Sequence, residues 1–225
     1  MIGKSWILAT LLASQSHPRL LRPLFRLKSD PYRYDKQQWE DEFRAGGWDF
    51  LTSPLERHRN TLLAGCVDQY APTGSVLEVG CGTGALQSSL LRNGHRAYLG
   101  VDISEAALTR ARSGGDSRST FVTAPAETFE PPESYDAIVF AETLYYLDDP
   151  VAQLVRYSRY LNPGGYLFIS MALNGLRDGL WKLSLWQELR SHFETANEIN
   201  LFFSGGSTHA TAVAWTVKVL KPENG

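Results

Sequence analysis

A turn rich in glycine, with a carboxylate just ahead of it, is the part of the sequence best suited to hold a ligand. The stretch "VLEVGCGTG" (residues 76–84) places Glu78 in an apolar run and glycines at positions 80, 82 and 84. Glycines permit a tight turn and a close approach of the backbone to a ligand. With Ala85 they also satisfy the dinucleotide pattern G-x-G-x-x-[G/A]. The glycines alone therefore do not separate a hydride-transfer enzyme from one that uses another nucleotide cofactor.

Two carboxylates narrow the choice of nucleotide. Asp102 ends an apolar stretch about twenty residues after the glycines, where a carboxylate can accept hydrogen bonds from ribose hydroxyls. Enzymes that bind NAD share this acid, so Asp102 does not discriminate. Glu78 does, because a carboxylate beside the turn would repel a pyrophosphate and attract a cationic group such as an ammonium or a sulfonium. The sequence therefore predicts a nucleoside ligand that carries positive charge.

The elements that must position these residues alternate from residue 76 onward. Short apolar segments that alternate with helical ones predict parallel strands with crossover helices. We predict an α/β fold with a Rossmann-like, doubly wound seven-stranded sheet, mostly parallel, with an antiparallel last strand. Ligands in such sheets bind beyond the carboxyl ends of the strands, where the glycines and Asp102 would lie. The expected strands are 76–80, 97–102, 119–123, 135–141, 166–171, 198–203 and 211–220, and the expected helices are 84–92, 104–112, 150–161 and 180–193.

The N-terminal region is expected to form a helical arm or lid. Residues 34–43 read as a helix, and Ser53 with Glu56 reads as a capping box that opens the next one. We divide the chain into an arm or lid (1–52) and a cofactor-binding domain (53–225). Residues 1–28 are basic and apolar, so they could pack on the domain or contact a membrane surface, and their first part also resembles a short signal peptide.

Composition excludes several classes of partner. Lys plus Arg number 22 against 24 Asp plus Glu in 225 residues, so no positive field favours nucleic acid. Cys66 and Cys81 stand apart from any C-x-x-C or Cys/His cluster, so neither disulfides nor a zinc site are expected. A reducing cytoplasm fits this cysteine usage.

Four ordered motifs resemble those of the class I S-adenosylmethionine-dependent methyltransferases. "VLEVGCGTG" is similar to their first motif, an acid followed by G-x-G-x-G, and "YLGVDIS" to the strand that reads the ribose. "YDAIVFAETLYYLDDP" resembles the fourth strand with the following helix start, and "LNPGGYLFIS" the fifth strand. The resemblance covers about Val76 to Met171. It implies S-adenosylmethionine as cofactor and a small-molecule methyl acceptor.

The resemblance implies a role for each matched residue. Glu78 would orient the methionine ammonium, and the Ala141 carbonyl would accept from the same group. Asp102 would bind the ribose hydroxyls, Ile103 would lie against one face of the adenine, and backbone groups of Ala126 would meet its edge. The implied cofactor-binding residues are Glu78, Gly80, Cys81, Gly82, Asp102, Ile103, Ala126, Glu127 and Ala141.

One segment departs from the family pattern. Many members carry Gly-Asp-Ala-Glu after the third strand, whereas "APAE" (residues 124–127) places Pro125 where the acid that accepts from the adenine amino group would lie. Glu127 could substitute for that acid. Alternatively, Glu127 is an exposed carboxylate in a first turn, and the backbone suffices.

The segment after the fourth strand offers candidates for acceptor binding and catalysis. "AETLYY" (residues 141–146) resembles the "MEMLEH" type of segment in quinone-ring O-methyltransferases, whose later Glu and His are thought to support a metal. Here Tyr145 and Tyr146 replace that pair, so we predict no metal, although Glu142 remains. Either tyrosine could bind substrate or pack in the core.

Two further candidates come from the ends of the chain. His209 lies in "SGGSTHA" (residues 204–210), which would turn at the cofactor end of the sheet if the sixth strand is parallel. An imidazole titrates in a useful range there, although a solvated turn histidine is the alternative. Trp39, with Trp48 and Tyr34, could close over the cofactor or could pack in a core. The candidate catalytic residues are His209, Tyr146, Tyr145 and Glu142.

Three functions remain open from the sequence. The first is methyl transfer to a hydroxyl or amine of a metabolite, sugar, lipid or quinone-like acceptor. The second is a protein that binds S-adenosylmethionine as a partner subunit without transferase activity. The third, an NAD-dependent oxidoreductase, is disfavoured by Glu78 and by the order of elements.

Overall fold

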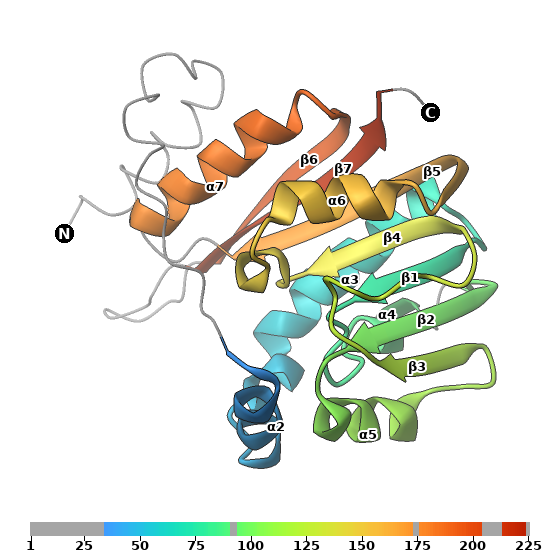
Figure 1. Cartoon of the computed structure of the whole chain (residues 1–225), viewed down its shortest axis with the longest axis vertical. Coiled ribbons are helices and arrows are strands. Elements are labelled where there is room, and N and C mark those ends of the chain that lie inside the picture. The colour runs from blue at the N-terminus through green and yellow to red at the C-terminus, as the bar shows by residue number, and fades with distance from the viewer. Residues whose placement is uncertain (1–33, 91–93, 173–175, 204–212, 224–225) are drawn as a thin grey trace.

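The computed structural model describes residues 34–90, 94–172, 176–203 and 213–223 of the chain. The elements alternate in the order that the sequence predicts (Figure 1). The helices are α2 (Lys36–Arg44), α3 (Pro54–Tyr70), α4 (Gln87–Leu90), α5 (Glu105–Gly114), α6 (Pro150–Ser158) and α7 (Leu176–Leu189), with 3-10 turns η4 (Asp49–Thr52) and η5 (Leu144–Tyr146). The strands are β1 (Ser75–Val79), β2 (Ala97–Asp102), β3 (Ser119–Thr123), β4 (Tyr135–Ala141), β5 (Leu161–Ala172), β6 (Phe193–Phe203) and β7 (Val213–Pro222).

The seven strands form one sheet in the order β3-β2-β1-β4-β5-β7-β6. Neighbours among β1 to β5 are parallel, and β7 pairs antiparallel with both β5 and β6. The predicted fold class is therefore confirmed, including the antiparallel last strand and a sixth strand parallel to the first five. The order reverses beside β1, and this switch point is where such sheets bind ligands.

Helices cover both faces of the sheet, as Figure 1 shows. Alternate residues of β1 enter different cores, because successive side chains of a strand point to opposite faces. Leu77 packs with residues of α6 and α7, whereas Val76 packs with residues of α3 and α4. Glu78 follows Val76 by two positions and so faces the α3 side. All five residues of β1 are buried, which fits a central parallel strand.

Some predicted boundaries are wrong. Residues 84–86 form a turn rather than the start of a helix, and Leu161 begins β5 rather than ending α6. The strand β6 starts at Phe193, where helix was predicted, because pairing with β7 extends over its whole length. The capping box at Ser53 is only half formed. Its Oγ accepts from the Glu56 N–H (3.4 Å), whereas the Glu56 side chain binds elsewhere.

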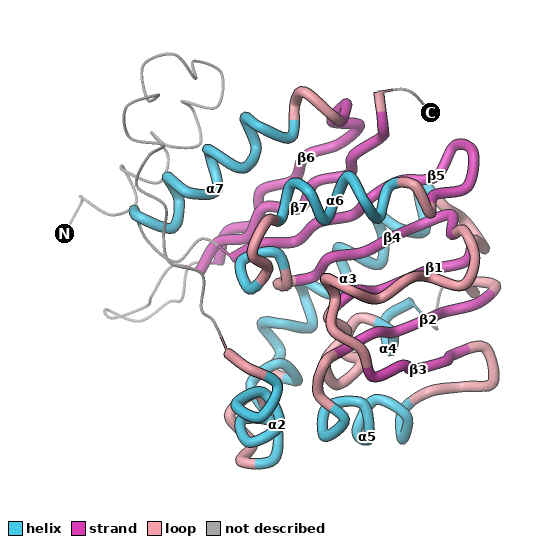
Figure 2. The backbone as a smooth tube through the Cα atoms, viewed as in Figure 1, coloured by secondary structure: helices cyan, strands magenta, loops and turns pink. Residues whose placement is uncertain are grey.

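The first helix of the described residues, α2, lies beyond the carboxyl ends of the parallel strands, beside the loops that Figure 2 shows in pink. A complete capping box starts it, with Asp35 Oδ1 accepting from the Gln38 N–H (2.8 Å) and Gln38 Oε1 accepting from the Asp35 N–H (2.8 Å). Residues 1–28, for which packing or membrane contact was predicted, lie outside the described residues. In the described part of the chain, no helix combines the length and the apolar character that a membrane span requires.

Candidate functional site

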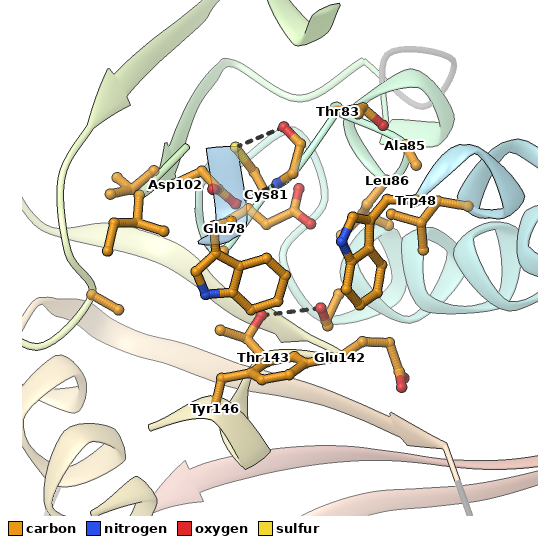
Figure 3. A pocket seen from close by; sticks show the side chains of 18 of the residues that line it. Trp48, Glu78, Cys81, Thr83, Ala85, Leu86, Asp102, Glu142, Thr143 and Tyr146 are labelled. Carbon is orange, nitrogen blue, oxygen red and sulfur yellow. Dashed lines mark hydrogen bonds between the residues drawn. The ribbon is translucent and has the colours of Figure 1, made fainter. Parts of the chain in front are cut away.

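A cavity of about 1010 Å³ opens where α2, α3 and the loops after β1, β2 and β4 meet. Figure 3 shows Glu78, Asp102, Trp48, Glu142 and Tyr146 around this space. The structure brings together every sequence-predicted site residue that it describes, which are Trp39, Glu78, Gly80, Cys81, Gly82, Asp102, Ile103, Ala126, Glu127, Ala141, Glu142, Tyr145 and Tyr146. His209 lies outside the described residues, and its role stays a prediction.

Backbone hydrogen bonds join the glycine turn to the neighbouring strand β2. Gly80 and Cys81 both donate backbone N–H groups to the Val101 carbonyl, at 2.7 and 3.0 Å. Gly80 has φ +74°, which favours glycine, and a Cβ there would lie 2.5 Å from Thr143 Oγ1. The turn is therefore fixed in shape against the residues after β4.

Glu78 brings a buried carboxyl group to the cavity wall. It is 2% exposed, and its Oε2 accepts a hydrogen bond from the Tyr98 hydroxyl (2.5 Å). Burial raises its pKa to about 8, although the Tyr98 hydrogen bond and the charge of Arg59 oppose that rise. A cationic ligand beside Glu78 would favour the ionised form.

Asp102 ends β2 and holds the glycine turn by hydrogen bonds. Its Oδ2 accepts from the Gly82 N–H (2.8 Å), and its Oδ1 accepts from the Ser104 N–H (2.9 Å). Burial raises the pKa of Asp102 to about 6, against the effect of these backbone donors. The Asp102 carboxylate thus holds the loop after β1 next to the loop after β2.

The loop after β3 presents backbone to the cavity. The Ala126 carbonyl already accepts from Tyr157 Oη (2.8 Å) and from Arg156 Nη2 (2.5 Å). Its N–H makes no hydrogen bond within the described chain and remains able to donate to a ligand. Glu127 lines the cavity with an exposed side chain, and Ile103 lines it from the loop after β2.

Aromatic rings from α2 and the segment after it cover the cavity. The ring of Trp39 lies 4.9 Å from that of Tyr146, 5.3 Å from that of Trp48 and 6.1 Å from that of Phe43, centroid to centroid. Trp48 presents an indole N–H that is buried and has no hydrogen-bond partner among the described residues. Trp39 thus packs on other rings and also lines the cavity, while its closure over the cofactor stays a prediction.

Glu40 joins α2, which carries part of this aromatic cover, to residues 104–106 at the start of α5. Its carboxylate accepts from the N–H groups of Glu105 (2.7 Å) and Ala106 (3.0 Å) and from Ser104 Oγ (3.3 Å), at the start of α5. Burial opposes ionisation, but the two backbone donors and Ser104 outweigh it and lower the pKa of Glu40. A negative charge is favoured at a helix N-terminus, so the contact joins α2 to the loop that holds Asp102.

A buried ionic network lies on the α3 side of the cavity. Arg59 is 3% exposed, and its Nε donates to Glu56 Oε2 (2.8 Å). Its Nη1 lies 3.9 Å from Glu142 Oε1 and 3.5 Å from Ser170 Oγ. Burial would lower the pKa of Arg59, but the charges of Glu142 and Glu56 more than offset that effect and raise it.

Glu142 is held in a backbone conformation that its side-chain contacts must maintain. It has φ +58°, a region that non-glycine residues seldom adopt. Its Oε1 accepts from Ser170 Oγ (2.9 Å), and its Oε2 accepts from the Ala172 N–H (2.9 Å) and the Tyr145 hydroxyl. Burial raises the pKa of Tyr145 well above its usual value, and the nearby Glu142 adds to that rise. Tyr145 therefore serves Glu142 as a donor.

Sequence reasoning missed Arg59, Glu56, Ser170 and Glu40. The spacing of Glu56 and Arg59 at i and i+3 was a signal for a helical ion pair, but the capping motif took precedence in reading Glu56. Ser170 and Glu40 act across more than 25 residues of sequence, and no local pattern marks them. In the part of the chain that the structure describes, His, Cys, Asp and Glu form no group of three able to hold a metal ion.

A protein family described as a methyltransferase domain matches residues 55–207. The chain belongs to this methyltransferase family. The match covers β1 to β6 and the whole glycine turn, so the predicted resemblance to class I S-adenosylmethionine-dependent methyltransferases is confirmed, and with it the cofactor.

Curated relatives of this methyltransferase-family chain include an O-methyltransferase and a nodulation protein. It is 35% identical over 133 residues to a ubiquinone biosynthesis O-methyltransferase of Hahella chejuensis, covering 55% of each protein. It is 31% identical over 130 residues to nodulation protein S of Rhizobium tropici, covering 56% of this chain and 54% of the relative. The chain thus spans about half the length of the curated relatives it matches.

Solved structures agree with the fold of this methyltransferase-family chain. The N-methyltransferase NodS from Bradyrhizobium japonicum WM9, in complex with S-adenosyl-L-homocysteine, superposes with a TM-score of 0.67 at 21% identity. The superposition covers 87% of this chain and 100% of that one. At this identity the likeness supports the fold.

Proposed function

We propose that the protein transfers a methyl group from S-adenosylmethionine to a hydroxyl or amine of a small molecule. The observation that carries the proposal is one cavity that joins the two cofactor carboxylates, Glu78 and Asp102, to a separate set of polar and aromatic groups. A cavity of about 1010 Å³ has room for a nucleoside cofactor and a second molecule. The bound cofactor would supply an activated methyl group on a sulfonium.

The groups around the glycine turn suit that cofactor. Glu78 presents a buried carboxyl group whose charge a cationic ligand would balance. Asp102 presents its carboxylate at the loop after β2. The Ala126 N–H is left to donate to the adenine edge, with Ile103 against the ring. The Ala141 carbonyl, which lies 3.1 Å from Thr143 Oγ1 in the cavity wall, would accept from the methionine ammonium.

The acceptor would lie between the aromatic cover and the ionic network. The buried indole N–H of Trp48 lacks a partner among the described residues and would donate to an acceptor oxygen. Tyr146 and Trp39 provide ring faces on the same side. The acceptor would bond to the methyl carbon as the sulfur–methyl bond breaks, and Glu142 would take the proton that the acceptor loses.

The N-terminal residues 1–52 are proposed to serve as the lid of the catalytic domain, which spans residues 53–225. The contact of Glu40 with α5 supports this division, because it places α2 over the cofactor loop. A lid would exclude water from the methyl group and commit the bound acceptor. His209 remains a proposed acceptor-side residue. No metal is required for the proposed chemistry, because the sulfonium is already activated.

Two experiments test the proposed function. Calorimetry should show micromolar binding of S-adenosylmethionine and S-adenosylhomocysteine and no binding of NAD at the same concentrations. Methyl-labelled cofactor should then release label to hydroxyl- or amine-bearing compounds in a metabolite extract, and mass spectrometry of the product identifies the methylated atom.

Variants separate the alternatives. Glu142→Gln should bind S-adenosylhomocysteine as the parent does but lose most of its turnover, and Asp68→Asn, at an exposed position of α3, should change neither. Binding without methyl release to any acceptor would favour the partner-subunit alternative. Failure to bind either sulfur ligand would overturn the proposed function.

A further inference from the structure

Tyr98 reaches the cofactor carboxylate along its own strand. It is 2% exposed, and Gly100 follows it by two positions on the same face of β2. Gly100 pairs in register with Glu78 of β1. A Cβ at Gly100 would lie 3.0 Å from Tyr98 Cε1, so the tyrosine ring occupies the space that a larger residue would take. The Tyr98 ring thereby extends over Gly100, and its hydroxyl reaches Glu78.

The hydrogen bond from Tyr98 occupies one oxygen of the Glu78 carboxyl group and leaves the other oxygen available to a ligand. Glu78 Oε2 accepts from the Tyr98 hydroxyl at 2.5 Å, and Oε1 accepts no hydrogen bond from the described residues. Glu78 also lines the cavity. We propose that Tyr98 is a positioning residue, whose hydroxyl holds Glu78 so that its second oxygen receives the ammonium of the cofactor's methionine part.

The inference rests on the proposed function but adds a role for Tyr98, a residue of the "YLGVDIS" segment to which the family resemblance assigns none. Tyr98 does not line the cavity, so it acts through Glu78. The other ionisable groups that face Glu78 are Arg59 from α3, Asp102 from the end of β2 and Cys81 from the turn. Of these, Arg59 favours the carboxylate and Asp102 opposes it.

The contact also sets the pH range in which Glu78 can receive a cation. Burial raises the pKa of Glu78 to about 8, and the Tyr98 hydrogen bond lowers it relative to burial alone. Without the hydroxyl, the pKa of Glu78 rises further, and more of the free protein carries a neutral Glu78 at pH 7. Binding of an ammonium then requires loss of that proton, so affinity falls on the acid limb of the pH profile.

The test is calorimetry of Tyr98→Phe, which keeps the buried ring and removes one hydroxyl. The probes are S-adenosylhomocysteine and 5′-methylthioadenosine, which shares the nucleoside and lacks the amino acid part. We expect Tyr98→Phe to weaken S-adenosylhomocysteine about tenfold at pH 7 and to move the acid limb upward by about one pH unit. Affinity for 5′-methylthioadenosine should stay within twofold.

Two controls separate positioning from a structural role. Tyr135→Phe changes an equally buried tyrosine on β4, whose hydroxyl makes no hydrogen bond among the described residues, and should change neither affinity. In a Glu78→Gln background, Tyr98→Phe should have no further effect. Equal weakening of both probes, or an unchanged pH profile, would overturn the inference. Failure of the parent protein to bind S-adenosylhomocysteine would instead overturn the proposed function.

Discussion

The cavity has two sides that are built in different ways. The cofactor side relies on backbone groups close in sequence to the motifs, such as the Gly82 and Ser104 N–H groups that Asp102 accepts from. The proposed acceptor side relies on side chains from distant segments. Arg59 of α3 lies 3.9 Å from Glu142, which follows β4, and 3.5 Å from Ser170 in β5. A short motif specifies the first side, whereas packing of the whole fold creates the second.

The two sides also differ in how their charges are balanced. On the acceptor side Arg59 lies between Glu56 and Glu142, so the protein supplies its own counter-ion. On the cofactor side burial raises the pKa of both Glu78 and Asp102, and Arg59 is the one cation among the main influences on Glu78. A cationic ligand would thus balance the negative charge on the cofactor side. The charges of the proposed acceptor side are balanced before any ligand binds, and the following predictions test this difference.

The largest effect is expected where the protein supplies its own counter-ion, and it should be an effect on the free energy of unfolding. Arg59→Met leaves buried Glu56 and partly buried Glu142 without their cation, and should reduce the free energy of unfolding by about 3–5 kcal/mol. Urea denaturation measures this loss. Arg57→Met, at an exposed position of the same helix, should cost less than about 1 kcal/mol. Equal losses for both variants would refute the difference between the two sides.

On the cofactor side, the matching change should affect ligand binding more than folding. Asp102→Ala removes a carboxylate that accepts from two backbone N–H groups and faces the proposed ribose. We expect affinity for S-adenosylhomocysteine to fall about 100-fold, because charged hydrogen bonds contribute about 1.5–3 kcal/mol each. Calorimetry measures the change, with Asp68→Ala on the exposed face of α3 as control. A loss below threefold would remove Asp102 from the site.

This difference explains what the sequence could predict. Glu78, Gly80 and Asp102 stand in fixed relation to predicted strands, so alternation and glycine geometry placed them correctly. Glu142 was found because it directly follows a strand, but its left-handed backbone and its partners were not. Those partners depend on how β5 and α3 pack against the sheet. Strand ends such as Phe193 were misjudged for the same reason, because pairing with β7 overrides local preference.

The proposed lid should show an intermediate effect, because α2 contacts both sides of the cavity. Glu40→Gln keeps the shape of the side chain but removes a negative charge from the start of α5. Such a charge contributes about 1 kcal/mol, so affinity for S-adenosylhomocysteine should fall about fivefold through faster dissociation. Stopped-flow fluorescence of the lid tryptophans measures the rate. Asp41→Asn, whose side chain is 64% exposed on the same helix, should leave it unchanged.

The smallest effect is expected from one substitution made on both sides. Because burial raises the folded-state pKa of Glu78 from 4.5 to about 8, the folded chain keeps a proton there that the unfolded chain loses. The stability of the ligand-free protein therefore decreases as pH rises through this window. Glu78→Gln lacks this penalty, and at pH 9 it should unfold at a temperature about 2–4 °C higher than the parent, for a gain of about 1 kcal/mol.

Glu142→Gln should have the opposite sign under the same conditions, because it removes one of the two carboxylates that balance buried Arg59. Thermal denaturation from pH 5 to pH 9 compares the two variants, and the gain for Glu78→Gln should nearly vanish at pH 5. If both substitutions destabilise the protein at pH 9, Glu78 is already balanced within the fold. A cationic ligand would then add nothing that Arg59 and Tyr98 do not supply, and the distinction between a self-balanced side and a ligand-balanced side would fail.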